Sequence, residues 1–166
     1  MIEVRIGELA SAAEMAILRP VSADWAAVTS ASRRLELAAG PAVLEQCSRL
    51  GELLVGSAVI TGAGDLQAQY LVHVAVRSRE EPVTPAIVRR GLVNGLRRLS
   101  EWAVESVAMP PLGTGAGNLD TEHAAEIMVP VLREHMGGSE HPARVVIVVE
   151  NEYERLAFER LLEAIP

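Results

Sequence analysis

The chain has 166 residues, of which 49% are hydrophobic and only 3% aromatic, so a single domain with a largely aliphatic core is expected. Its formal net charge of −7 argues against nucleic-acid binding driven by bulk electrostatics. All 15 basic residues are arginine, and without lysine a Walker-type phosphate loop and Schiff-base catalysis are both excluded.

The first half of the chain predicts four strands and two helices. Strands are expected at 2–6 and 15–21, and helices at 30–40 and 41–51, separated by Gly40-Pro41. The β-branched segments 57–63 and 70–76 predict two further strands, and the short connection between them permits an antiparallel hairpin.

The second half alternates between helix and strand patterns. Helices are expected at 84–103, 119–136 and 151–165, and strands at 105–111 and 143–150. Thr84 and Asp120 are the predicted N-caps of the first two helices, and Pro130 is expected to bend or interrupt the second. The face of helix 84–103 expected to pack on the sheet consists of Ile87, Val88, Leu92, Leu96 and Leu99.

This order of elements predicts an α/β fold, a three-layer α/β/α sandwich around a central mixed, mostly parallel sheet. One domain is expected over residues 1–166. The apolar runs are too short to span a membrane and the N-terminus lacks a signal-peptide pattern, so a cytoplasmic protein without membrane contacts is expected.

Metal binding and disulfide chemistry are not indicated. Cys47 is the only cysteine and is expected to be a buried, inert thiol. The four histidines show no metal-binding spacing, so no metal and no cofactor are predicted. The arginines at 89, 90, 97 and 98 are expected to form the solvated face of a helix.

A glycine-rich segment, MPPLGTGAG at 109–117, follows one predicted strand and precedes a helix. Ligands of α/β sheets bind beyond the carboxyl ends of strands, where glycine lets backbone N–H groups approach an anion closely. The start of a helix adds favourable potential for such an anion. The segment therefore predicts an anion site, with a tight turn of purely structural purpose as the alternative.

The longer segment M-P-P-L-G-T-G-A-G-N-L-D, with the A-A-containing helix behind it, resembles the second phosphate loop of macrodomains. Three other stretches agree with this family: Gly40-Pro41, the strand of 55–61, and Val72-His73-Val74. The resemblance covers nearly the whole chain and implies a free-standing macrodomain that binds ADP-ribose or an ADP-ribosylated protein or metabolite.

The resemblance also implies a set of ligand contacts. In the family the glycine loop holds the diphosphate and distal ribose, and a G-D-I segment near the adenine corresponds to Gly7-Glu8-Leu9. Arg19 is a candidate phosphate contact and Asn151 a candidate border of the adenine pocket. The predicted ligand-binding residues are Gly113, Thr114, Gly115, Ala116, Gly117, Asn118, Glu8, Leu9, Arg19 and Asn151.

The first ligand loop departs from the family pattern of N-A-A-N, a glycine run and an aspartate. Arg19-Pro20-Val21-Ser22 stands for N-A-A-N, the segment 27–30 replaces the glycine run, and Ser32 replaces the aspartate. The aspartate helps to position or activate water in hydrolytic members, a role that Ser32 cannot fill as a base. Ser22 and Ser32, together with His73, are the remaining catalytic candidates. Trp25 lies in this altered loop and is expected to pack rather than stack on a ligand.

Three functions follow from these residues. The first is a binding module for ADP-ribose or a related nucleotide diphosphate, without efficient hydrolysis. The second is a hydrolase of ADP-ribosyl or O-acetyl-ADP-ribose linkages with an unconventional site. The third is a structural or interaction module that has lost the ligand. The replacements at Ser22 and Ser32 favour the first function over an enzyme.

Overall fold

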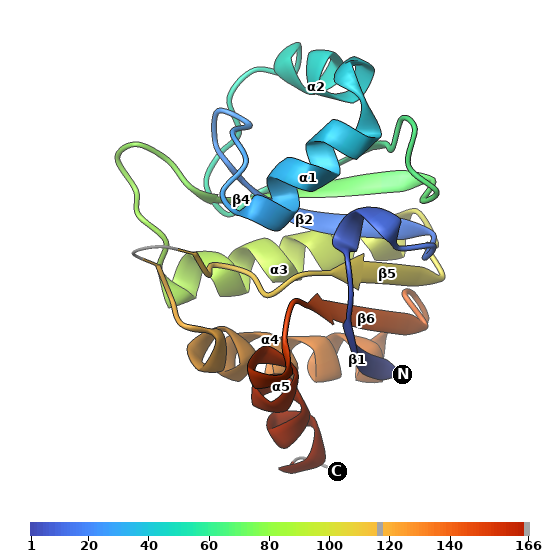
Figure 1. Cartoon of the computed structure of the whole chain (residues 1–166), viewed down its shortest axis with the longest axis vertical. Helices are drawn as coiled ribbons and strands as arrows, with labels where there is room; N and C mark the ends of the chain where they lie inside the picture. Colours follow the sequence, from blue (N-terminus) through green and yellow to red (C-terminus); the bar gives the residue numbers. More distant parts are fainter. Residues whose placement is uncertain (116–117, 165–166) are drawn as a thin grey trace.

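One six-stranded sheet forms the centre of the computed structural model, which describes residues 1–115 and 118–164 (Figure 1). The strands are β1 (Ile2–Ile6), β2 (Ala16–Ser22), β3 (Ala58–Gly62), β4 (Tyr70–Arg77), β5 (Ser106–Met109) and β6 (Arg144–Val149). Their order is β1-β6-β5-β2-β4-β3, and all neighbours pair in parallel except β3 and β4. The sheet is therefore mixed and mostly parallel, and the predicted β3–β4 hairpin is confirmed.

Helices cover both faces of this sheet, which confirms the predicted three-layer α/β/α sandwich. The helices are α1 (Ser30–Ala39), α2 (Pro41–Ser48), α3 (Pro85–Glu101), α4 (Thr121–Gly138), α5 (Glu152–Ala164) and the short 3-10 helix η1 (Leu9–Ser11). One buried cluster joins the sheet to α3, α4 and α5, and a second joins its other face to η1, α1 and α2. No helix among the described residues is long and apolar enough to cross a membrane.

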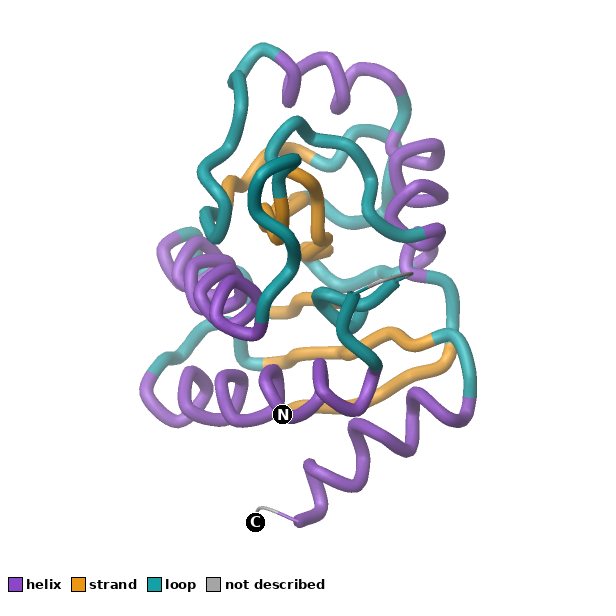
Figure 2. Tube along the Cα trace, turned by 90° about the vertical axis from the view of Figure 1, so that its left-hand side faces the viewer, coloured by secondary structure: helices purple, strands orange, loops and turns teal. Residues whose placement is uncertain are grey.

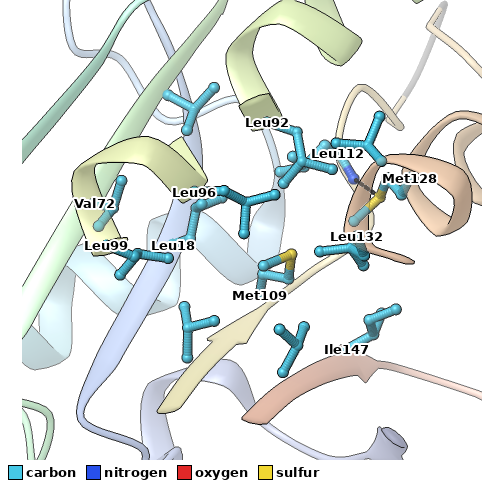
Figure 3. Close-up of a cluster of buried hydrophobic side chains, with 14 of the residues drawn as sticks. Leu18, Val72, Leu92, Leu96, Leu99, Met109, Leu112, Met128, Leu132 and Ile147 are labelled. Carbon is cyan, nitrogen blue, oxygen red and sulfur yellow. Dashed lines mark hydrogen bonds between the residues drawn. The ribbon is translucent and has the colours of Figure 1, made fainter. Parts of the chain in front are cut away.

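The larger buried cluster packs α3 and α4 against the sheet (Figure 3). All five α3 residues expected to face the sheet are buried. Of the four arginines expected on the solvated face, Arg89, Arg90 and Arg97 are exposed and Arg98 is half-buried. Figure 3 also shows the backbone N–H of Leu112, just beyond β5, donating to the Met128 sulfur of α4 at 3.3 Å. This contact attaches the start of the glycine-rich loop to the core.

The helix ends follow the sequence signals. Thr84 Oγ1 accepts a hydrogen bond from the Ile87 N–H, and Asp120 Oδ1 accepts one from the His123 N–H, so both predicted N-caps are confirmed. Of the two effects expected of Pro130, a bend or an interruption, the interruption does not occur, since α4 continues from Thr121 to Gly138. Pro130 is exposed, so water can reach the carbonyl that loses its partner, while buried neighbours on the other side hold the helix to the sheet.

Candidate functional site

An open pocket of about 560 Å³, here called the large pocket, lies beyond the carboxyl ends of β1, β5 and β6. Figure 2 is viewed from this edge of the sheet, and the loops that follow the strands run across the front of the view. Four segments meet at the pocket: the β1–η1 junction, the loop into α1, the glycine-rich loop into α4, and the β6–α5 junction. The lining comprises Gly7, Leu9, Val28, Thr29, Ser30, Ala31, Arg33, Pro110, Pro111, Thr114, Gly115, Leu119, Asp120, Thr121, Val148, Glu150, Tyr153 and Glu154.

The glycine-rich loop contributes one buried and one exposed glycine with positive φ. Gly113 has φ 81°, and a Cβ there would lie 2.6 Å from Val88 Cγ2, so its role is to fit the turn onto α3. Thr114 and Gly115 line the pocket, and Gly115 has φ 123°. The Asn118 N–H donates to the Gly115 carbonyl at 3.1 Å, which folds the loop back on itself. Ala116 and Gly117, also predicted to bind the ligand, lie outside the described residues.

The altered first loop faces the glycine-rich loop without closing the pocket. Val28 and Thr29 both line the pocket, and Thr29 caps α1 by accepting the Ser32 N–H at 3.1 Å. A Cβ on Gly115 would lie 3.5 Å from the Val28 carbonyl oxygen, so the two loops lie close together. The β-branched residues that replace the glycine run therefore still border an open space.

Trp25, in the same loop, packs into the core. Its indole N–H donates to the Gly51 carbonyl at 2.7 Å, and its ring meets the His73 ring edge-on with 5.2 Å between centroids. The side chain is buried, as the packing interpretation of the sequence expected.

The β1–η1 and β6–α5 junctions add apolar, aromatic and acidic groups to the lining. Leu9 and Val148 are its apolar side chains from these junctions, and Tyr153, 60% exposed, is its aromatic one. The Tyr153 hydroxyl donates to Glu122 at 3.1 Å, and this hydrogen bond raises the pKa of Tyr153. Tyr153 was not among the predicted site residues. The sequence signal that could have identified Tyr153 is an aromatic residue shortly after the last predicted strand.

Glu8, expected near the adenine, is paired instead of lining the pocket. Arg34 of α1 donates to Glu8 Oε1 at 2.9 Å and to Glu150 Oε1 at 2.6 Å, which joins α1 to the ends of β1 and β6. The bond to Glu8, followed by that to Glu150, raises the pKa of Arg34. Asn151 also stays outside the lining, because its Oδ1 caps α5 by accepting the Glu154 N–H at 2.9 Å.

Arg19 lies in the core, which corrects the expectation that it contacts a phosphate. Its side chain is 1% exposed. Nη1 lies 2.5 Å from Glu36 Oε1 and 3.4 Å from Ser32 Oγ, and Nε donates to His73 Nδ1 at 2.9 Å. The physical reason is strand alternation, since Arg19 shares a face of β2 with Ile17 and therefore points under α1.

The catalytic candidates do not meet at the pocket. Ser32 is fully buried and donates to the Pro20 carbonyl at 3.3 Å, and Ser22, 9% exposed, lines smaller neighbouring pockets with Asp24. His73 is fully buried beside Thr61 Oγ1 at 2.8 Å, and burial, followed by the Arg19 charge, holds the pKa of His73 well below its usual value. None of the three lines the large pocket.

Cys47 belongs to the same buried group, and its sulfur lies 3.7 Å from His73 Nε2. Burial raises the pKa of the Cys47 thiol, so the neutral, unreactive form expected from the sequence is favoured. Among the described residues, no group of three or more histidine, cysteine, aspartate or glutamate side chains is arranged to hold a metal ion.

Comparison with known proteins identifies the family. The Macro domain model matches residues 27–128, more than half of the chain. The chain is 34% identical over 131 residues to the O-acetyl-ADP-ribose deacetylase of Escherichia coli K12, covering 75% of this chain and 74% of that enzyme. This chain belongs to the macrodomain family.

Other relatives are much longer than this chain. An uncharacterized protein of Mycobacterium tuberculosis is 32% identical over 127 residues, covering 76% of this chain but only 35% of that protein. The chain therefore spans about a third of the length of its mycobacterial relatives.

Solved structures share the fold at low sequence identity. A glycine-to-valine variant of the Oceanobacillus iheyensis macrodomain with ADPR has a TM-score of 0.90 at 17% identity, covering 99% of this chain and 92% of that one. The Trypanosoma brucei macrodomain in complex with ADP-ribose has a TM-score of 0.87 at 17% identity, covering 97% and 68%.

Proposed function

We propose that this macrodomain binds ADP-ribose, or a related nucleoside diphosphate or ADP-ribosylated molecule, in the large pocket without efficient hydrolysis. The observation that carries the proposal is the open pocket bordered by Thr114 and Gly115 on one side and by the start of α1 on the other. Both borders supply backbone N–H groups, which suit a diphosphate. The solved relatives with ADP-ribose support this choice of ligand.

Two parts of the pocket lining suit the two chemically different parts of such a ligand. The diphosphate would lie between the glycine-rich loop and α1, where glycine at position 115 allows close backbone approach. The base would lie between Leu9, Val148 and the exposed ring of Tyr153, since apolar and aromatic side chains favour a flat heterocycle.

We propose that hydrolysis is inefficient because of where the catalytic candidates lie. Ser32 lies on the buried face of α1, and its hydroxyl donates a hydrogen bond to the Pro20 carbonyl. A neutral hydroxyl is also a poor general base for activating water. The competing function is deacetylation of O-acetyl-ADP-ribose, which is favoured by the 34% identical relative that bears this name.

Calorimetric titration with ADP-ribose, ADP and AMP tests the proposal. We expect micromolar binding of ADP-ribose, about −8 kcal/mol. Gly115→Val should abolish it, because valine is strained by about 1–3 kcal/mol at this φ and forces the loop to move. Gly62→Val is the matched control, since Gly62 lies at the end of β3 with negative φ and open space around it.

The outcomes separate the candidate functions. Turnover of O-acetyl-ADP-ribose by the wild-type chain would favour the deacetylase. No heat with any of the three nucleotides would refute ligand binding and leave a structural or interaction module. Equal binding by Gly115→Val and wild type would show that the ligand lies elsewhere.

A further inference from the structure

Arg33 is the one basic residue among the described residues that line the large pocket. The three lining carboxylates all have partners within the protein. Asp120 accepts the His123 N–H at 2.7 Å, Glu150 pairs with Arg34 at 2.6 Å, and Glu154 accepts the Glu150 N–H at 2.8 Å. The exposed Arg33 side chain, in contrast, forms no hydrogen bond or ion pair with any described residue. Its charge is therefore available to a ligand.

Arg33 lies on the side of the pocket that borders the glycine-rich loop. Arg33 lies in the first turn of α1, where its own N–H donates to the Thr29 carbonyl at 3.0 Å. Ser30 and Ala31, also in the lining, belong to the same turn, whose first N–H groups have no partner within the helix. The adjoining Val28 carbonyl lies next to Gly115, so this turn borders the glycine-rich loop.

The segment just before this turn offers an anion less than a glycine run would. Its β-branched residues Val28 and Thr29 resist the positive φ values that let successive backbone N–H groups converge on a phosphate. A guanidinium group can replace such a set of backbone N–H groups, because it donates two parallel hydrogen bonds to phosphate oxygens. Its long side chain also lets it reach a phosphate that the backbone does not approach.

We propose that Arg33 binds the diphosphate of the nucleotide and supplies the phosphate contacts that a glycine run would otherwise provide. This inference rests on the proposed function. It makes the affinity of the site depend on a second phosphate, so ADP-ribose and ADP bind clearly more tightly than AMP. Removing a charged hydrogen-bond donor from such a site weakens binding about 10- to 100-fold.

Calorimetric titration of Arg33→Ala and Arg33→Lys with ADP-ribose, ADP and AMP tests this role. Arg33→Ala should raise the Kd for ADP-ribose and ADP about 10- to 100-fold and reduce the preference for ADP over AMP. Arg33→Lys should recover part of both. Arg97→Ala removes the same charge from the exposed side of α3, away from the pocket, and should bind like wild type.

The preference for ADP over AMP is measured within one variant, so it does not depend on how much of that variant is folded. If wild type binds ADP-ribose and Arg33→Ala keeps the same Kd and the same preference, the role of Arg33 is refuted while the proposed function stands. If wild type binds no nucleotide, both are refuted.

Discussion

The buried pair between Arg19 and Glu36 gives the most quantitative prediction about this fold. The Arg19 side chain is 1% exposed and that of Glu36 17%, with 2.5 Å between Nη1 and Oε1. Glu36→Gln keeps the shape but removes the carboxylate charge, which leaves a cation in the core. Breaking a buried pair in this way costs about 3–5 kcal/mol, and we take about 3 kcal/mol because water still reaches Glu36.

Arg19→Met should behave differently. It removes the cation together with its desolvation cost. His73 Nδ1 loses its hydrogen bond and Glu36 loses its ion pair, but water reaches the Glu36 carboxylate, so we expect a loss of about 1–2 kcal/mol. In a chain that lacks Arg19, Glu36→Gln no longer leaves a buried cation without its partner. The double variant Arg19→Met with Glu36→Gln should therefore be about as stable as Arg19→Met alone.

Urea denaturation and thermal melting at pH 7 measure these differences. A loss of about 3 kcal/mol corresponds to a decrease in Tm of about 6–12 °C for a chain of this size. A loss below about 1 kcal/mol for Glu36→Gln, or strictly additive losses in the double variant, would refute the reasoning. Arg19→Met should bind ADP-ribose like wild type, and a tenfold weaker Kd would restore Arg19 as a ligand contact.

Two further predictions concern the core beneath the site. Burial and the Arg19 charge lower the pKa of His73 well below 6.5 in the folded protein, so below pH 6.5 the unfolded state binds a proton that the folded state does not. The free energy of unfolding should therefore not depend on His73 well above pH 6.5. Below pH 6.5 it should fall by up to about 1.4 kcal/mol per pH unit. Urea denaturation at pH 7.5 and 5.5 checks this, and an unchanged slope in His73→Gln would contradict it. Gly113→Val should lower the free energy of unfolding by about 2–4 kcal/mol, because φ is 81° and the new Cβ meets Val88 at 2.6 Å. Thermal melting against Gly137→Ala, a change in open space on α4, measures this loss, and equal Tm values would be evidence against it.

Local signals in the sequence were sufficient for most elements of the fold. The apolar spacing of α3 identified its buried face, and Thr84 and Asp120 marked the starts of α3 and α4. Element ends were less accurate. The strand predicted to reach residue 111 ends at Met109, because the two prolines that follow have no N–H to donate to a neighbouring strand.

Side-chain direction was harder to predict at the site. Both faces of this sheet are covered by helices, so hydrophobicity alone does not show which face a strand residue meets. Arg19 seemed placed for a ligand because it stands where the family has an asparagine, yet its face of β2 lies under Ser32 and Glu36 of α1.

The amino-acid sequence by itself determined the class of fold, the place of the glycine-rich loop after β5, and the loss of the usual first-loop residues, because these depend on local pattern and spacing. Only the tertiary structure decided which charges meet. Arg34 joins Glu8 to Glu150, and Glu150 is 116 positions away from Arg34 in the sequence. The preceding residue, Arg33, lines the pocket, and its side chain pairs with none of the described residues. These two arginines are adjacent and chemically identical in the sequence, and their different roles arise from the direction in which α1 turns each one.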